Sequence, residues 1–456
     1  MKEKNPNIAE EIAEDLRKIL GMRKRSLKHH MIGLEAEFMI IDSDGNVSHS
    51  ADKILEKIPG NAKKECANNM IEIDTFPSRT ITGTMHDMLE RTQQLLDAME
   101  KMGYMPYFYG TYPGKFSPSM RKKGGYGIKE KIFGKERFKI AGRCIGFHCH
   151  YTLPRGMFDY ISKHLKIFIK SRISQTMVGS YNMLVAMDPV FTTFAQSSPY
   201  YEGRLYGKDS RLMFYRGSRI FGVDGLYSDF HDFGGLPPYH HTLLDIMHLI
   251  DDRFREWSLL IKKLGINIKT LALYGSVLDT NWSPVKINPN GTFEMRGMDM
   301  NRFEVLASLA VTMKFILKSI HEDYVNVVDS DIAIREPFKM EGDRIFIPPY
   351  SYVYNVLQRD SALYGMESPD LRLCCSRFLK LASKILPSDR KKFLKPLKEM
   401  VQKKKTVSDE IISEARKIGY KESLPNKAAA DIALRISRNI EKDIENTKKL
   451  VSRLAE

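Results

Sequence analysis

The sequence lacks the features that mark disulfide-stabilised, secreted or membrane-embedded proteins. Its 456 residues include five cysteines and no Cys-x-x-Cys pair, too few for a disulfide framework at this length. No run approaches the ~18 consecutive apolar residues of a membrane-spanning helix. The charged segment 1–17 also has no apolar centre of the kind that a signal peptide needs. We therefore expect a reduced, cytoplasmic protein that makes no use of a membrane.

Glycine motifs that hold phosphates are also missing. The chain has no Gly-x-x-x-x-Gly-Lys-Ser/Thr sequence and no Gly-x-Gly-x-x-Gly that follows a strand. Gly124-Gly125-Tyr126-Gly127 is more typical of a flexible turn than of a phosphate-binding loop. Together with strand patterns of the antiparallel type, this absence favours an α+β fold over a doubly wound sheet.

Positive charge is in excess. The chain has 71 Lys and Arg against 56 Asp and Glu, a formal net charge of +15 at pH 7. Such a balance attracts nucleic acid or small acidic molecules such as nucleotides and carboxylates. The basic tail after Phe393 contains one aromatic residue, Tyr420, which argues against stacking on single-stranded nucleic acid. A non-catalytic nucleic-acid-binding protein stays open as a disfavoured alternative.

Short strand patterns alternate with helical patterns along the chain. Period-two alternation predicts strands at 32–41, 70–76, 145–153 and 291–297, and helical spacing predicts helices at 8–20, 84–102, 157–187, 242–264 and 302–320. Residues 110–137, rich in glycine and lysine, predict a long functional loop. From residue 371 the chain is helical and highly charged. We predict a domain over residues 1–370 and a C-terminal helical extension over 371–456. The extension is expected to pack against that domain or a second subunit, which leaves a homo-oligomer open.

Ionisable residues occupy every second position of three predicted strands. They are Glu35, Glu37, His148, His150, Glu294 and Arg296. Because successive side chains of a strand point to opposite faces, the intervening Leu34, Phe147 and Met295 share the other face. We therefore predict a curved antiparallel sheet with one polar face, and with helices on its apolar face.

A hairpin is predicted next to these strands. Residues 64–73 fit two short strands joined by a turn at Asn68-Asn69, since asparagine tolerates the backbone that tight turns demand. In this register Glu65 lies directly opposite Glu72. Like charges placed opposite each other destabilise a sheet, so a cation between them would explain the pair.

Each pattern alone is typical of a structural feature that binds no metal: a solvent-facing strand, hydrogen-bonded histidines or a surface ion pair. Together, five carboxylates and two imidazoles on strand faces match a site for a hard cation. Mg²⁺ prefers oxygen ligands and nucleotide phosphates, and Mn²⁺ also accepts imidazole. Tetrahedral zinc is disfavoured because no cysteine joins the polar face.

In this order, the motifs resemble the type 2 glutamate–cysteine ligase family. The matching elements are Gly33-x-Glu35-x-Glu37, the Glu65…Glu72 hairpin, Gly146-x-His148-x-His150 and Gly291-Thr292-x-Glu294-x-Arg296-x-x-Asp299. Further matches are Ser198-Pro199-Tyr200-x-Glu202-Gly203, Gly207-x-x-Ser210-Arg211 and Gly235-Leu236-Pro237-Pro238. The resemblance extends from about residue 30 to about residue 365.

The resemblance implies an ATP-dependent carboxylate–amine ligase with the catalytic fold of glutamine synthetase. ATP would be the co-substrate, with two or three Mg²⁺ or Mn²⁺ ions. The side-chain carboxylate of L-glutamate would be activated as an acyl phosphate and joined to an amine. L-cysteine is the leading amine, which would give γ-glutamylcysteine for glutathione biosynthesis. A ligase of the same fold that uses another amine, amino acid or carboxylate stays open.

Site residues follow from the matched positions. The resemblance implies one metal ion on Glu37, Glu65 and Glu72, and another on Glu35, His148 and Glu294. It implies nucleotide contacts for His150 and Lys286, and phosphate contacts for Arg296, which with Glu294 would carry the catalytic role. The amino-acid pocket would involve Ser198, Tyr200, Glu202 and Arg211, and segment 110–137 would cover the site.

Two departures from the family pattern concern the second substrate. The family usually has Trp-Asp-x-Arg-Pro where this chain has Trp282-Ser283-Pro284-Val285-Lys286, and a lysine cannot replace a bidentate guanidinium. The family's arginine after Gly-x-x-Ser also comes one residue later than Arg211 does. These differences leave the identity of the amine open.

Overall fold

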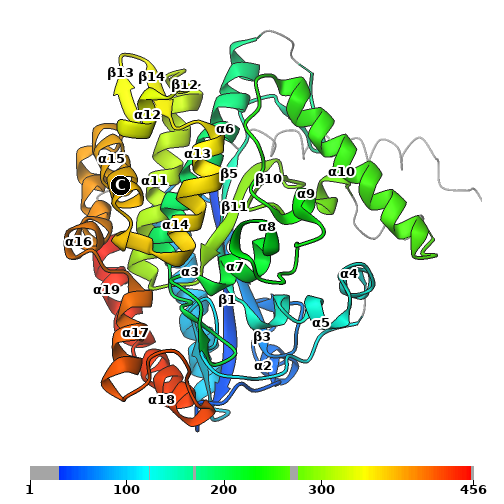
Figure 1. Cartoon of the computed structure of the whole chain (residues 1–456), viewed down its shortest axis with the longest axis vertical. Helices are drawn as coiled ribbons and strands as arrows, with labels where there is room; N and C mark the ends of the chain where they lie inside the picture. Colours follow the sequence, from blue (N-terminus) through cyan, green and yellow to red (C-terminus); the bar gives the residue numbers. More distant parts are fainter. Residues whose placement is uncertain (1–29, 123, 168–170, 268–275, 453–456) are drawn as a thin grey trace, which may run out of the picture.

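A seven-stranded antiparallel sheet forms the centre of the computed structural model, which describes residues 30–452 except 123, 168–170 and 268–275 (Figure 1). The strand order is β10-β11-β5-β1-β3-β2, and β4 also pairs with β1. The strands are β1 (Ile32–Asp42), β2 (Lys63–Lys64), β3 (Met70–Asp74), β4 (Tyr104–Tyr107), β5 (Gly146–Thr152), β10 (Val285–Asn288) and β11 (Thr292–Asp299). The α+β prediction is confirmed. The predicted helix 8–20 lies outside the described residues.

Smaller sheets and many helices surround this sheet. The short strands are β6 (Phe158–Asp159), β7 (His164–Leu165), β8 (Tyr200–Tyr201), β9 (Arg204–Leu205), β12 (Asn326–Asp329), β13 (Lys339–Glu341) and β14 (Arg344–Ile347). The longer helices before residue 369 are α3 (Ile81–Glu100), α4 (Gly125–Phe133), α6 (Arg172–Ala195), α7 (Ser210–Arg216), α10 (Leu243–Lys263), α11 (Phe303–Glu322) and α14 (Gln358–Leu363). The shorter ones are α2 (Ala51–Leu55), α5 (Lys135–Phe138), α8 (Ser218–Phe221), α9 (His231–Gly234), α12 (Ile332–Arg335) and α13 (Tyr350–Tyr352).

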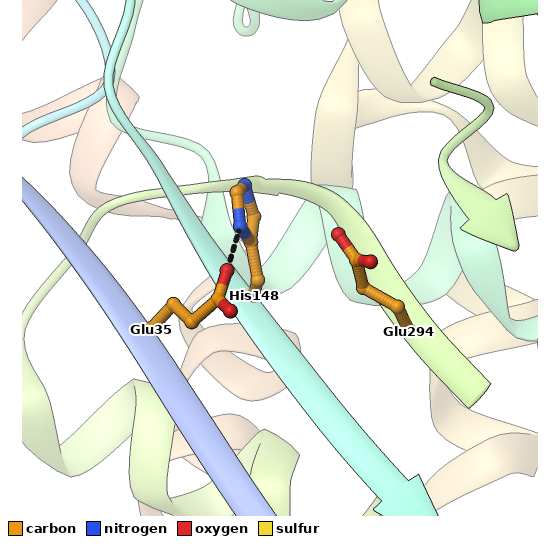
Figure 2. A group of neighbouring side chains, drawn as sticks. All are labelled: Glu35, His148 and Glu294. Carbon is orange, nitrogen blue, oxygen red and sulfur yellow. Dashed lines mark hydrogen bonds and ion pairs between the residues drawn. The ribbon is translucent and has the colours of Figure 1, made fainter. Parts of the chain in front are cut away.

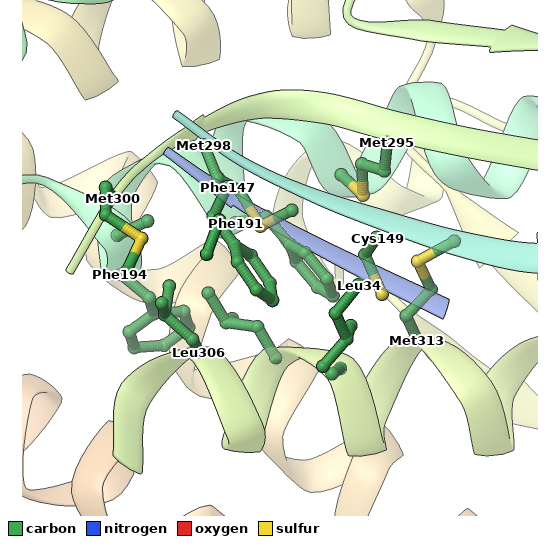
Figure 3. Close-up of a cluster of buried hydrophobic side chains, with 14 of the residues drawn as sticks. Leu34, Phe147, Cys149, Phe191, Phe194, Met295, Met298, Met300, Leu306 and Met313 are labelled. Atoms are coloured by element: carbon green, nitrogen blue, oxygen red, sulfur yellow. The ribbon is translucent and has the colours of Figure 1, made fainter. Parts of the chain in front are cut away.

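The apolar face of the sheet forms the main core. Leu34, Phe147 and Met295 project from β1, β5 and β11 towards Leu306 and Met313 of α11, and all are buried (Figure 3). Helices α3, α6 and α11 cover this face. Burying one such side chain contributes ~1.5–3 kcal/mol, so this layer holds the strands in register.

Local signals set where several helices begin. The Thr80 side chain accepts a hydrogen bond from the Gly83 N–H at 3.0 Å and starts α3. Thr242 and Asp245 form a reciprocal capping box at the start of α10. Such caps satisfy N–H groups that have no partner inside the helix.

Two elements differ from the sequence prediction. Residues 157–187 do not form one helix: β6 and β7 pair with each other, and α6 begins only at Arg172. The apolar spacing of Met157, Phe158 and Leu165 fits a helix over a short run, but here it serves a small hairpin. Segment 110–137 is not a continuous loop either, because it contains α4 and all but the last residue of α5.

Five α-helices follow residue 368 in the described part of the chain: α15 (Pro369–Ile385), α16 (Lys395–Lys403), α17 (Val407–Lys417), α18 (Asn426–Ser437) and α19 (Ile440–Ser452). They lie on the side of the sheet that α11 covers, opposite α4 and α5 (Figure 1). Helix α15 packs on α6 and α11, and α19 packs on α3 and α11. The Phe303 N–H donates to Asp443 Oδ2 at 2.7 Å. The expected packing on the preceding domain is therefore observed, while the boundary at residue 371 stays a prediction.

None of the described helices combines the length and apolar character that crossing a membrane requires.

Candidate active site

The polar face of the central sheet brings together charged groups from three neighbouring strands. Glu35 pairs with His148 across β1 and β5, and Glu294 pairs with His150 across β5 and β11. Glu35, His148 and Glu294 point to the same side of the sheet (Figure 2). Glu35 Oε2 lies 2.8 Å from His148 Nδ1. This face is buried rather than solvent-facing, since His148 and Glu294 are only 4% and 3% exposed.

Two groups of side chains have the spacing of metal ligands. In each group, one possible ligand atom per residue lies within 4.8 Å of the others. The groups are Glu35, His148 and Glu294, and Glu37, Glu65 and Glu72. They are the two ligand sets that the resemblance implies. A third group of Glu35, Glu72 and Asp74 shares members with both.

The predicted hairpin register is wrong, although Glu65 still joins the site. Lys63, not Glu65, pairs with Glu72 across β2 and β3. The turn does fall at Asn68-Asn69. However, the residues before it pair elsewhere, because the Arg121 N–H donates to the Cys66 carbonyl and the Asn68 N–H to the Ser119 carbonyl. This outside partner pulls residues 66–68 away from β3.

The acidic group at β3 contains more negative charge than its neighbours neutralise. Burial, with Glu35 and Glu65 nearby, raises the pKa of Glu72 well above its ordinary value, although Lys63 Nζ lies 2.9 Å from its carboxylate. Burial also raises the pKa of Glu37, against the opposing influence of His148. Buried like charges of this kind ionise fully only beside a cation.

The carboxylates nearer β11 are held ionised instead. Although burial opposes ionisation, Lys286 and Arg296 lower the pKa of Glu294 to about 2. Lys286 Nζ lies 3.7 Å from Glu294 Oε2, and Arg296 Nη1 lies 3.3 Å from Glu294 Oε1. Similarly, burial would raise the pKa of Glu35, but His150 and His148 hold it well below its ordinary value.

A cavity of about 390 Å³ lies over the polar face. Its sheet side includes every predicted metal ligand together with Lys63, Lys286 and Arg296. Its other walls come from α4, α5, α7 and the segments around Tyr227 and Trp282. A polar cavity between a sheet and the helices that face it suits chemistry that must limit the access of water.

His150 lies beside the cavity rather than in its lining. Its Nδ1 is 3.1 Å from Thr292 Oγ1, and its Nε2 is 3.1 Å from Glu35 Oε1. Burial lowers the pKa of His150, but the Glu35 carboxylate outweighs this and raises it overall. In the structure this histidine therefore contacts Glu35 directly, and its nucleotide role stays a prediction.

The four residues expected in an amino-acid pocket do not line this cavity. Ser198 Oγ donates to Asp209 Oδ1 at 3.2 Å inside the protein. The Tyr200 side chain is buried, and Glu202 Oε1 forms an ion pair with Arg143 at 3.0 Å near the surface. Their substrate role stays a prediction.

Arg211 supports the strand that presents Arg296. Its Nη1 donates to the Gly297 carbonyl at 3.1 Å and its Nη2 to the Arg296 carbonyl at 3.4 Å. The pairing of β11 with β5 shifts register between Met295 and Met298, so these carbonyls belong to an irregular stretch of strand. Arg211 therefore fixes the backbone that carries the Arg296 guanidinium.

Sequence reasoning missed the residues that face the sheet from across the cavity. Tyr126 and Lys129 of α4, Tyr215 of α7, Tyr227 and Asp279 all contribute to the lining. Tyr126 Oη lies 3.4 Å from Glu65 Oε2. No periodicity marks these positions, and the glycine- and lysine-rich composition of 110–137 was the one signal that pointed to the region.

The donor set fits divalent magnesium or manganese. Carboxylate oxygens with one imidazole are the ligands these ions accept, and no cysteine sulfur belongs to either group. The raised pKa of Glu72 marks a site with too little positive charge of its own.

Comparison with known proteins shows the family of this chain and the fold that it shares. The sequence profile of glutamate-cysteine ligase family 2 matches residues 31–341. A search of curated protein sequences finds no match. The fold is similar to that of glutamate–cysteine ligase from Francisella tularensis in complex with AMP, with a TM-score of 0.59 and 13% identity over 93% of this chain and 92% of that one. It is also similar to a bifunctional glutathione synthetase from Pasteurella multocida, with a TM-score of 0.53 and 12% identity over 93% of this chain and 54% of that one. This chain therefore belongs to glutamate-cysteine ligase family 2 and is an ATP-dependent carboxylate–amine ligase.

Proposed function

We propose that the enzyme activates the side-chain carboxylate of L-glutamate with ATP and joins it to L-cysteine, giving γ-glutamylcysteine. The carboxylate would attack the γ-phosphate to form an acyl phosphate, and the amine would then displace phosphate and leave an amide. Family membership supports the reaction class. The two groups of possible metal ligands on the polar face are the single observation that most supports this mechanism.

Magnesium or manganese would be held by the same two groups. Glu37, Glu65 and Glu72 are proposed for one ion, and Glu35, His148 and Glu294 for the other. When bound, such ions offset the charge of the nucleotide phosphates and of the group being transferred.

The protein's own groups orient and protect the reactants. Arg296 has a side chain 25% exposed beside Glu294, and its guanidinium is proposed to contact the transferring phosphoryl group. Lys286, on the other side of Glu294, keeps that carboxylate ionised. Tyr126 and Lys129 extend from α4 over the sheet, where they help to exclude water that would hydrolyse an acyl phosphate.

A phosphate-release assay with Mg²⁺, ATP and glutamate, run against a panel of amines and amino acids, tests the proposal. We expect release that requires both glutamate and an amine, and that is fastest with cysteine. Release that is faster with another amine would keep the ligase mechanism and reassign the second substrate. No release with any amine would contradict the proposed reaction.

A further inference from the structure

The cavity over the polar face is lined by two sets of charged side chains. One set is the carboxylates of Glu37, Glu65 and Glu72, with Lys63 Nζ 2.9 Å from Glu72. The other set is three cations, Lys129, Lys286 and Arg296, which influence one another and lie near the carboxylates of Glu294 and Asp279. Three cations near two carboxylates offer more positive charge than the protein itself neutralises.

The cations of the cavity differ in how they are paired. Lys63 Nζ lies 2.9 Å from Glu72 and 2.6 Å from Asp74. Lys286 and Arg296 share the carboxylate of Glu294. Among residues 30–452, apart from the undescribed gaps, no carboxylate lies within ion-pair distance of Lys129, although Glu65 and Asp279 are near enough to influence it.

Aromatic rings hold the Lys129 ammonium in place. Its Nζ lies 4.8 Å from the centre of the Trp282 ring and 5.6 Å from that of Tyr126. Contacts of this kind fix a cation without neutralising it. Burial, together with the nearby Arg296, lowers the pKa of Lys129 to about 8, as expected for an ammonium group that lacks an anion.

We propose that Lys129 is a phosphate-binding residue of this ligase, and that its ammonium group contacts the γ-phosphoryl group of ATP from the side opposite Arg296. This inference rests on the proposed function. The glutamate carboxylate oxygen forms a bond to the γ-phosphorus while the bond from that phosphorus to the β–γ bridging oxygen breaks. ADP leaves with the electron pair. Lys129 then stabilises the charge on the three transferring oxygens and transfers no proton.

A phosphoryl group suits this position better than the glutamate carboxylate does. Three converging cations match a group with several anionic oxygens, whereas a single carboxylate would leave most of their charge unmatched. Lys129 also acts from α4, while Lys286 and Arg296 belong to β10 and β11. The anion would thus be held between the sheet and the helix that faces it.

Calorimetric binding to the full chain with Mg²⁺ tests the role of Lys129. The ligands are a non-hydrolysable β,γ-methylene analogue of ATP, and ADP. In Lys129→Met, which keeps an unbranched side chain but removes the ammonium group, we expect the ATP analogue to bind at least tenfold more weakly and ADP to bind within twofold of wild type. Lys129→Arg, which restores the charge, should recover much of the loss. Lys131→Met on the exposed side of α4 is the matched control and should bind both ligands as wild type does.

Three outcomes would overturn the inference. Lys129→Met could bind the ATP analogue as tightly as wild type, could lose affinity for the ATP analogue and for ADP equally, or could lose affinity for glutamate alone in the same calorimetric measurement. Melting temperatures of the variants show whether each is folded. Because the binding experiment needs no amine, it decides the role of Lys129 separately from the phosphate-release assay, which decides the reaction.

Discussion

The two faces of the central sheet are made by alternate residues of the same strands, yet they have opposite consequences for the molecule. Leu34, Phe147 and Met295 pack against α11 and stabilise the fold. Glu35, His148 and Glu294 lie on the other face, among groups of both charges, where His148 and Glu294 are buried and Glu35 is partly exposed. Charged groups are therefore taken out of water on one face only, and only the apolar face is stable without a ligand.

This difference indicates where function resides. Buried carboxylates that repel one another reduce stability, as the raised pKa values of Glu37 and Glu72 indicate. A bound cation would remove this repulsion, which explains why the carboxylates lie so close together. Substitutions on the polar face should therefore change activity, and substitutions on the apolar face should change stability.

Glu72→Gln and Glu65→Gln should give the strongest effect. Each removes an anionic ligand from one proposed metal site, and we expect kcat to fall about 1000-fold, equivalent to ~4 kcal/mol. The melting temperature should stay the same or rise, because each substitution removes one negative charge from a group of neighbouring carboxylates. Steady-state ATP turnover and thermal unfolding measure the two effects. Wild-type kcat at ordinary Mg²⁺ in either variant would remove that residue from the site.

Leu34→Ala tests the opposite face one residue away from Glu35. Leu34 is 1% exposed, so its truncation leaves a cavity and should lower the free energy of unfolding by about 3 kcal/mol. Denaturant unfolding measures this change, and kcat per folded molecule should stay near wild type. A large loss of kcat with unchanged stability would show that the two faces are not separable in this way.

Arg296→Lys should have a smaller effect on catalysis. It keeps the charge but loses the planar guanidinium, and we expect kcat to fall about 30-fold, or ~2 kcal/mol, with little change in ATP affinity. Arg211→Lys is a useful companion, because Arg211 contacts the backbone of Arg296 and should give a weaker effect in the same direction. An effect confined to the KM for ATP would argue against a role of Arg296 in the transition state.

The pH dependence of stability should reveal Glu72 directly. The pKa of Glu72 is raised above the ordinary value of 4.5 in the folded protein. In metal-free protein, its contribution to the free energy of unfolding is therefore fully present below pH 4.5. This contribution is lost as the pH rises towards the folded pKa, by at most about 1.4 kcal/mol per pH unit. When unfolding is measured in EDTA, the free energy of unfolding of Glu72→Gln should therefore increase relative to that of wild type as the pH rises from 4.5 to 7. A constant difference between the two proteins would mean that Glu72 titrates normally.

The sheet and its polar face were predictable because period-two alternation is local. Glu35, His148 and Glu294 fall on one face by strand geometry alone, and antiparallel pairing then brings them together. The Asn68-Asn69 turn was predictable because the preference of asparagine for tight turns is also local, and it does not depend on the register of the flanking strands.

Features that depend on distant segments were not predictable. The pairing of Cys66 and Asn68 with residues 119–121 changes the hairpin register, and nothing near residue 66 indicates it. Lys129 likewise lines the cavity beside Trp282 and Arg296, which are remote from it in sequence. Such contacts arise from tertiary packing, which overrides local patterns.

Binding of Mn²⁺ to the full chain, followed by electron paramagnetic resonance, tests most directly whether the polar face is built for divalent cations. Our account predicts that wild-type protein binds Mn²⁺, that Mg²⁺ competes for it, and that Glu72→Gln and Glu294→Gln each weaken binding at least tenfold. Wild-type protein that binds no Mn²⁺, or both variants binding it as tightly as wild type, would contradict that account.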